Sequence, residues 1–312
     1  MKVLVTGGAG FIGSHVADTL LAAGHQVVIV DNLHTGHRYN VPAQASFHEI
    51  DIRNYAALEE LFAAEQFDAI SHQAAMANVR ESMSNPVPYA EVNVIGTLNL
   101  LDLSRKHGVK KIVMASTGGA VYGEGYSEDG SRLPFTEATW PQPKDNYGAT
   151  KLSCEFHLDL YHANYGLKYI ALRYPNVYGP RQDSKGEAGV VAIFAGAMLA
   201  DAPTKITGDG KQQRDYAYVG DVARANKLAL ESDAVGIYNV GTGVPTDVNT
   251  VHTTLSQITE YEQAPTYIPR PAGEVLATYL DSSKAKRDLG WQAEVPLAEG
   301  LRRVVEWMKD NQ

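Results

Sequence analysis

The 312-residue sequence contains a single cysteine, Cys154. One thiol cannot form a disulfide within the chain, so folding does not require an oxidising compartment. The sequence also lacks the Cys/His spacings typical of metal sites, and its ten histidines follow no common pattern. We therefore expect no metal site and a cytoplasmic protein.

Basic residues and long apolar runs are also scarce. Lys and Arg number 27 against 36 Asp and Glu, which gives a formal net charge of −9. A nucleic-acid-binding protein usually carries a basic surplus or patch, so no nucleic-acid partner is expected. No stretch approaches the roughly 20 apolar residues of a membrane span, and the apolar run at the N-terminus is too short for a signal peptide. No membrane association is expected either.

The sequence does have enough apolar material for a core, since 44% of its residues are hydrophobic. Short apolar runs alternate with helix-like segments, an order that predicts a parallel sheet covered by helices on both faces. The expected strands are Lys2–Thr6, Gln26–Asp31, Phe47–Ile50, Phe67–His72, Lys111–Ser116 and Lys168–Arg173. The expected helices between them are Gly10–Ala23, Tyr55–Ala64, Val87–His107 and Asn146–Tyr165.

The pattern becomes irregular after Arg173, where glycine and proline cluster. Helical segments return at Val190–Leu199, Val222–Glu231, Val248–Thr259 and Leu297–Met308. We predict an α/β protein with a Rossmann-type doubly wound parallel sheet in residues 1–173 and a smaller C-terminal lobe in residues 174–312. Whether parts of this lobe pack back on the first domain is left open.

A glycine-rich loop, Gly7-Gly8-Ala9-Gly10-Phe11-Ile12-Gly13, joins the first expected strand to the first expected helix. Such glycines permit a tight turn and a close approach to a pyrophosphate, and the helix N-terminus presents unpaired N–H groups to it. Asp31, 18 residues past Gly13, ends the second strand, where a carboxylate binds ribose hydroxyls and repels a 2′-phosphate. The loop therefore favours NAD over NADP. The alternative is a structural turn with an exposed aspartate.

Tyr147 and Lys151 lie four residues apart on an expected helix, so their side chains share one face. A free tyrosine has a pKa of about 10 and is a poor base at neutral pH. A nearby ammonium group favours the phenolate, which can then exchange a proton with a substrate hydroxyl. The alternative is an exposed tyrosine beside a solvated lysine, but the preceding loop favours the catalytic interpretation.

The Gly-x-x-Gly-x-x-Gly spacing and the Tyr-x-x-x-Lys pair together resemble the extended short-chain dehydrogenase/reductase family. Within that family, the sequence most resembles the UDP-glucose 4-epimerases of the NAD-dependent epimerase/dehydratase group. The match extends from the loop to Asp281-x-Ser-Lys284 and Leu289-Gly-Trp291, near the C-terminus. The resemblance implies these NAD-binding residues: Gly7, Gly10, Phe11, Ile12, Gly13, Asp31, Asn32, Asp51, Ile52, Gln73, Ala74, Ala75, Asn93, Tyr147 and Lys151.

A third catalytic hydroxyl is expected after the fifth strand. Most related enzymes carry Ser or Thr four residues before the tyrosine that matches Tyr122, but this chain has Gly118 there. We predict that Thr117 supplies the hydroxyl, with Ser116 second; either could instead bond to the backbone. The related 4,6-dehydratases carry Thr-Asp-Glu where this chain has Gly118-Gly119-Ala120, so dehydration is disfavoured.

The resemblance also implies a set of sugar-nucleotide ligands. They are Thr117, Tyr147, Asn176, Arg214, Arg270, Glu274 and Thr278. Arg214 and Arg270 would bind the diphosphate, but Arg270 is one residue further from its glycine than in relatives, and Glu274 replaces an aspartate. Thr278 falls where a bulky residue excludes N-acetylated sugars in relatives, so a small residue there would admit them.

The implied activity is a 4-epimerisation of UDP-hexoses. Tyr147 takes the 4-hydroxyl proton while bound NAD takes the hydride from C4, and both return after the 4-keto sugar turns over. One alternative is a UDP-sugar acid epimerase or decarboxylase on the same scaffold. Another is a non-catalytic NAD-binding sensor, which retention of Tyr147 and Lys151 disfavours. The segments Val87–His107 and Asn146–Tyr165 pair in a homodimer in relatives, so a homodimer is expected by resemblance.

Overall fold

The computed structural model describes residues 1–125, 132–183, 189–270 and 275–311. At its centre lies a seven-stranded sheet in the order β11-β6-β5-β4-β1-β2-β3, with every neighbouring pair parallel. The strands are β1 (Lys2–Thr6), β2 (Gln26–Asp31), β3 (Ser46–Glu49), β4 (Ala69–His72), β5 (Lys111–Thr117), β6 (Lys168–Tyr174) and β11 (Gly236–Asn239). The predicted α/β class with a doubly wound sheet is confirmed. The strand order reverses between β1 and β4, the position at which such sheets bind ligands.

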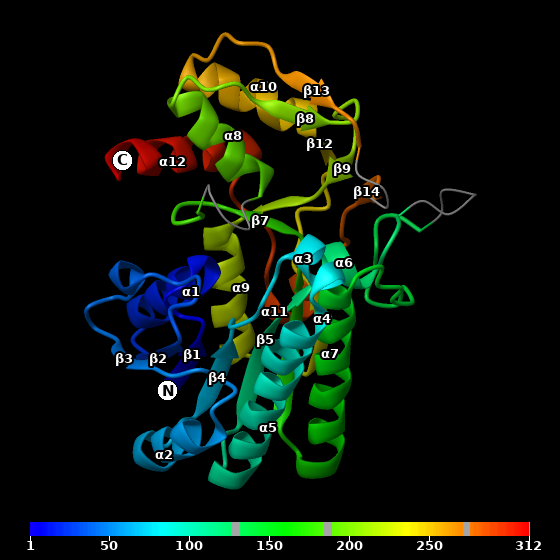
Figure 1. Ribbon diagram of the computed structural model, residues 1–312. Coiled ribbons are helices and arrows are strands. Elements are labelled where there is room, and N and C mark those ends of the chain that lie inside the picture. The colour runs from blue at the N-terminus through cyan, green and yellow to red at the C-terminus, as the bar shows by residue number, and fades with distance from the viewer. Residues whose placement is uncertain (126–131, 184–188, 271–274, 312) are drawn as a thin grey trace.

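Helices cover both faces of this sheet (Figure 1). Residues of α1 (Phe11–Ala22), α9 (Val219–Glu231) and α11 (Ser283–Leu289) share one apolar core with the sheet. Residues of α2 (Tyr55–Glu65), α5 (Gly96–His107) and α7 (Asn146–Tyr165) share the other. Successive strand residues alternate between these cores, as a pleated strand requires.

The ends of α7 agree with the predicted helix because both are set by local chemistry. The Asp145 carboxylate accepts a hydrogen bond from the backbone N–H of Gly148 at 2.7 Å and caps the first turn. Gly166 ends the helix in the left-handed region, with φ 71°. The capped helix carries Tyr147 and Lys151 on its first turns, next to the carboxyl ends of the strands.

The segment predicted as one helix over Val87–His107 is helical throughout but not uniform. It consists of α4 (Pro86–Tyr89), a π-helical segment η2 (Ala90–Ile95) and α5, preceded by α3 (Val79–Ser84). Apolar periodicity does not report such a change of pitch. Within this run the carbonyl of Asn93 accepts hydrogen bonds from the side chains of Thr97 and Cys154.

The remaining elements form most of a smaller lobe around a third apolar core. Its helices are α8 (Val190–Leu199), α10 (Val248–Thr259) and α12 (Leu297–Asp310). Its short strands are β7 (Asn176–Tyr178), β8 (Lys205–Thr207), β9 (Gln213–Arg214), β10 (Tyr216–Tyr218), β12 (Thr246–Asp247), β13 (Thr266–Ile268) and β14 (Ala277–Thr278). Two further short helical elements are η1 (Arg38–Asn40) and α6 (Gly118–Val121).

The two parts of the chain are interleaved, as Figure 1 shows. After the first short strands of the lobe, the chain returns to the large sheet with α9 and β11, and again with α11. The sequence left this return open. The division between residues 173 and 174 itself stays a prediction.

Candidate active site

A cavity of about 700 Å³, the central cavity, opens at the carboxyl ends of the strands of the large sheet. Nearly all of the residues that the sequence assigned to the cofactor line it. They are Gly7, Gly10, Phe11, Ile12, Gly13, Asp31, Asn32, Asp51, Ile52, Gln73, Ala74, Ala75, Tyr147 and Lys151. Asn93 is the exception, because it is buried behind the wall.

The glycine loop fits a close approach of the backbone to a ligand. Gly7 has a φ of 68°, and a Cβ there would lie 2.7 Å from the backbone nitrogen of Ala74. A Cβ on Gly13 would lie 2.0 Å from the carbonyl oxygen of Gly7. Gly10 precedes α1 and brings no capping side chain, and Gly10, Phe11, Ile12 and Gly13 line the cavity. The uncapped N-terminus of α1 at this wall is suited to an anion.

At one end of the cavity, Asp31 is held by backbone N–H groups. Its carboxylate accepts hydrogen bonds from Leu33 at 2.8 Å and Ala9 at 3.0 Å. Burial raises the pKa of Asp31, and these two hydrogen bonds oppose the shift. The resulting carboxylate at the end of β2 can accept hydrogen bonds from a ribose.

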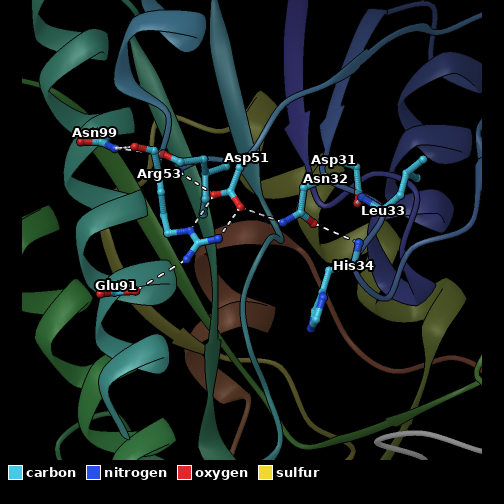
Figure 2. A network of polar contacts seen from close by, with 9 residues as sticks. Asp31, Asn32, Leu33, His34, Asp51, Arg53, Glu91 and Asn99 are labelled. Carbon is cyan, nitrogen blue, oxygen red and sulfur yellow. Dashed lines mark hydrogen bonds and ion pairs between the residues drawn. The ribbon is translucent and has the colours of Figure 1, made fainter. Parts of the chain in front are cut away.

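Beside Asp31, a network of polar contacts joins β2 to the loop after β3 and to the helices beyond (Figure 2). The Asn32 amide donates to the carboxylate of Asp51 at 2.9 Å. Arg53 donates to the same carboxylate through Nε at 3.0 Å and Nη2 at 2.8 Å, and its Nη1 lies 3.6 Å from Glu91. Hydrogen bonds from Arg53 hold the pKa of Asp51 well below its usual range, so this carboxylate is anionic.

Arg53 also lines the central cavity, although the sequence interpretation did not include it. The arginine two residues after Asp51 is the sequence feature from which this contact could have been predicted. Because the Arg53 guanidinium contacts both oxygens of that carboxylate, it fixes the plane of a group that the sequence assigned to the cofactor.

At the other end, Tyr147 and Lys151 line the cavity from successive turns of α7. Tyr147 is half-buried, and Lys151 is buried with its ammonium donating to the carbonyl of Ala115 at 2.8 Å. Burial lowers the pKa of Lys151, while the neighbouring Cys154 and Glu155 oppose that shift. A desolvated ammonium next to the tyrosine is the arrangement that favours a phenolate.

The two candidate hydroxyls at the end of β5 have different partners. Ser116 lines the cavity, but its hydroxyl donates to the Glu155 carboxylate at 2.5 Å. Glu155 forms a buried bidentate pair with Arg173, at 2.6 and 2.9 Å. Thr117 is not among the lining residues, and its hydroxyl accepts from the N–H of Ala120 at 3.2 Å. The hydroxyl proton of Ser116 is therefore donated to the Glu155 carboxylate. The hydroxyl of Thr117 accepts a hydrogen bond when it caps α6, so its own proton can still be donated to another acceptor.

The glycine at position 118 has a packing reason. A Cβ on Gly118 would lie 2.6 Å from Cδ1 of Leu280. Leu280 comes from the segment after β14 and packs with Tyr122 and Phe135. Leu280 therefore leaves little room for a side chain at position 118.

Of the predicted sugar-nucleotide residues, Thr117 lies on β5 and Tyr147 on α7, whereas Asn176, Arg214, Arg270 and Thr278 lie in the smaller lobe. Of those that the structure describes, only Tyr147 lines the central cavity. Arg214 on β9 is in register with Thr278 on β14, and it donates to the carbonyls of Gln213 and Val275. Thr278 is buried, Asn176 is half-buried at the start of β7, and Arg270 is exposed 3.3 Å from Asp209. Glu274 lies outside the described residues.

Within the described ranges, no group of three or more His, Cys, Asp or Glu side chains could hold a metal ion. The described helices also include none that is long and apolar enough to cross a membrane.

Three comparisons with known proteins bear on this site. The model of the NAD dependent epimerase/dehydratase family matches residues 3–241. The putative UDP-glucose 4-epimerase of Methanocaldococcus jannaschii is 46% identical over 309 residues, which cover 99% of each chain. The crystal structure of a Thermotoga maritima UDP-glucose 4-epimerase with UDP-glucose has a TM-score of 0.96 at 46% identity, covering 100% of this chain and 99% of that one. A Thermus thermophilus UDP-glucose 4-epimerase in complex with NAD has a TM-score of 0.92 at 45% identity, covering 99% of each chain.

The likenesses to the three epimerases extend over nearly the whole chain and, with the family model, confirm the family and the cofactor that the sequence predicted. The glycine loop, Asp31 and the Tyr147–Lys151 pair around one cavity fit an NAD-dependent reaction on a sugar hydroxyl. The chain belongs to the NAD-dependent epimerase/dehydratase family and is an NAD-dependent nucleotide-sugar 4-epimerase that acts on a UDP-sugar.

Proposed function

We propose that this epimerase interconverts UDP-galactose and UDP-glucose through a 4-keto sugar. The observation that carries the proposal is the placement of Tyr147 and Lys151 in the same cavity as the glycine loop and Asp31. A base and a dinucleotide site within one cavity let a hydroxyl proton and a hydride leave the same sugar carbon. Similarity to two UDP-glucose 4-epimerases over the full chain supports this substrate pair.

In the proposed reaction, Tyr147 as phenolate takes the proton from the sugar 4-hydroxyl, and the buried ammonium of Lys151 stabilises that phenolate. NAD held by the glycine loop and Asp31 in the central cavity would supply a reversible hydride acceptor for this chemistry. The 4-keto sugar turns its other face toward the cofactor before the hydride and the proton come back. One proton and one hydride leave and return, so no external oxidant or reductant is consumed.

We assign the third hydroxyl to Thr117 rather than to Ser116. The Ser116 proton goes to Glu155, so its oxygen can only accept a further hydrogen bond. Thr117 accepts from the Ala120 N–H and keeps its own proton for the sugar oxygen. Thr117→Ala is therefore expected to lower kcat far more than Ser116→Ala. Equal kcat values for the two variants would contradict the assignment.

Arg214 and Asn176 are the proposed diphosphate ligands, with Arg270 and Glu274 as further candidates. Arg214 and Thr278 lie in register on adjacent strands, and this register supports a gate for the sugar 2-substituent close to a diphosphate ligand. Because Thr278 is small, we propose that the N-acetylated pair is also accepted. Turnover of UDP-N-acetylglucosamine tests this, and no detectable turnover would refute it.

The main activity is tested with purified protein that has received no added nucleotide. Retained NAD is measured after denaturation, and conversion of UDP-galactose to UDP-glucose is followed without added reductant. We expect retained NAD and net conversion, and Tyr147→Phe is expected to lower kcat by at least about a hundredfold. Conversion that requires stoichiometric NADH, or an unchanged rate in Tyr147→Phe, would contradict the proposal.

We also propose a homodimer, formed through the outer face of α7 and the helical run before α5. Large apolar side chains are exposed on these neighbouring elements: Val87 63%, Ile95 49%, Phe156 65% and Leu160 53%. Phe156 and Leu160 are one turn apart on α7, so they form a stripe that a second copy can cover. Light scattering coupled to gel filtration is expected to give the mass of a dimer for the wild type. The double variant Phe156→Glu/Leu160→Glu is expected to have the mass of a monomer. A wild-type monomer at micromolar concentration would refute this part.

A further inference from the structure

A chain of buried hydrogen bonds runs beneath the central cavity from the glycine loop to the catalytic helix. Thr6 Oγ1 lies 2.7 Å from His72 Nδ1, and His72 Nε2 lies 3.0 Å from Thr97 Oγ1. Thr97 Oγ1 lies 2.5 Å from the carbonyl of Asn93, whose side-chain amide donates to Thr150 Oγ1 at 3.0 Å. We call these five residues, Thr6, His72, Thr97, Asn93 and Thr150, the relay. All five are buried.

The direction of every bond in the first half of the relay can be assigned. The Asn93 carbonyl can only accept, so the Thr97 hydroxyl donates to it. Thr97 Oγ1 then accepts from His72, which requires a proton on Nε2. The bare Nδ1 of a neutral His72 accepts from the Thr6 hydroxyl, and Thr6 Oγ1 accepts in turn from the N–H of Ala74 at 3.3 Å. This assignment is complete only for the neutral imidazole.

The surroundings of His72 keep it neutral. Burial, and to a lesser extent the charge of Lys151, lowers the pKa of the imidazole to about 3. A second proton on the ring would place an N–H opposite the Thr6 hydroxyl, which would then lose its own acceptor. The relay is therefore one fixed arrangement of protons near neutral pH.

The two ends of the relay touch the two halves of the reaction machinery. Thr6 directly precedes Gly7, and the N–H it receives comes from Ala74 in the cavity wall. At the other end, the Thr150 hydroxyl donates to the carbonyl of Tyr147 at 2.8 Å, and Thr150 directly precedes Lys151. The strands under the cofactor and the helix that carries the proposed base are thus joined through side chains rather than through packing alone.

The middle of the relay is held by the π-helical segment. Asn93 donates to the carbonyl of Met76 at 3.0 Å and accepts from its N–H at 2.8 Å, and Met76 lines the central cavity. The backbone carbonyl of Asn93 also accepts a hydrogen bond from the thiol of Cys154 on α7, at 3.1 Å. Asn93 thus joins the cavity wall at Met76 to α7 at Thr150 and Cys154.

We propose that His72 and Thr97 are positioning residues, which act through Asn93 and Thr150 to hold Tyr147 and Lys151 at a fixed distance from the cofactor loop. This inference rests on the proposed role of Tyr147 as the base. Misplacement of a reacting group by about 1 Å can cost on the order of a hundredfold in rate, so a break in the relay should lower kcat. The KM for the UDP-sugar should change little, because the proposed diphosphate ligands lie in the smaller lobe.

The test breaks the relay at Thr97 with a change of nearly constant volume. Thr97→Val removes the hydroxyl, and Thr97→Ser keeps it. Ser104→Ala is the matched control, because Ser104 is buried on the same helix and its hydroxyl donates to the carbonyl of Leu100 at 2.6 Å, outside the relay. Tyr147→Phe is measured in parallel. Each variant is assayed as the NAD-containing protein for kcat, KM and Tm.

We expect Thr97→Val to lower kcat by at least about tenfold with KM within twofold, whereas Thr97→Ser and Ser104→Ala keep kcat within twofold. An unchanged kcat in Thr97→Val, or an equal loss in Ser104→Ala, would overturn the inference. An unchanged kcat in Tyr147→Phe would instead overturn the proposed function. If Thr97→Val does not fold, Thr150→Val is compared with Thr150→Ser at the other end of the relay. Thr150→Val is then expected to lower kcat by at least about tenfold and Thr150→Ser to keep it within twofold, and an unchanged kcat in Thr150→Val would overturn the inference.

Discussion

The buried imidazole of His72 makes the protein sensitive to acid in a way that can be calculated. An unfolded histidine has a pKa of about 6.5, whereas burial lowers the pKa of folded His72 to about 3. Because the folded value lies below the unfolded one, the unfolded state binds the extra proton. The contribution of neutral His72 to stability is therefore fully present above pH 6.5 and is lost as the pH falls toward 3.

The size of the effect follows from these two values. At pH 5 nearly all unfolded chains carry the proton on residue 72, and almost no folded chain does. The free energy of unfolding should drop by about 2 kcal/mol between pH 7.5 and pH 5 from this residue alone, a factor of about 30 in the folded-to-unfolded ratio. His15 and His252 also have pKa values lowered by burial and act in the same direction, so the total change does not isolate His72.

The assay compares wild type with His72→Gln by urea unfolding at both pH values, each at the same saturating concentration of NAD. Glutamine cannot titrate in this range but can donate and accept hydrogen bonds. The variant is expected to be less stable at pH 7.5 and to lose about 2 kcal/mol less than wild type on acidification. An NMR titration of the His72 ring in wild type, which should show no shift down to pH 5, covers the case of an unfolded variant. Equal losses in the two proteins, or a ring that titrates near pH 6.5, would refute the reasoning.

Three further changes have expected results of their own. Gly13→Ala places a Cβ 2.0 Å from a backbone oxygen of the loop, so the purified variant should retain at least about tenfold less NAD, measured by absorbance after denaturation. Arg173→Met leaves the buried carboxylate of Glu155 unpaired and should cost about 3–5 kcal/mol in urea unfolding; a loss below 1 kcal/mol would show that the pair is dispensable. Gly118→Ser should cost about 1–3 kcal/mol through the contact with Leu280, and it should cost less in a Leu280→Ala background than in the wild type; an equal cost in the two backgrounds would contradict the packing argument.

The cofactor half of the molecule could be predicted from the sequence because its determinants are local. The glycine loop, the carboxylate of Asp31 and the helix capped by Asp145 each depend on residues close together in the chain. The inner strands of the large sheet, β1, β2, β4, β5 and β6, are buried on both faces and therefore appear as short apolar runs. The position of nearly every expected cofactor residue around one cavity follows from this order.

Features that depend on distant residues could not be predicted. The strands of the smaller lobe are two or three residues long and have no periodicity to detect. The π-helical turn exists where side chains of α5 and α7 meet the carbonyl of Asn93, a contact between separate segments. Position 118 is a glycine beside the side chain of Leu280, which is distant in the sequence. The hydroxyl of Ser116 donates to Glu155, which lies one helical turn past Lys151. Each of these requires the packed structure.

The return of the C-terminal half to the large sheet has a consequence for how the protein is made. Until β11 has left the ribosome, β6 has no neighbour on its outer edge, and without α9 one face of β4, β5 and β6 lacks its cover. A nascent chain that ends near residue 173 therefore exposes an open strand edge and an apolar surface, both of which favour aggregation. The cofactor half, although its synthesis begins first, completes its sheet and one of its two cores only when α9, β11 and α11 have been made.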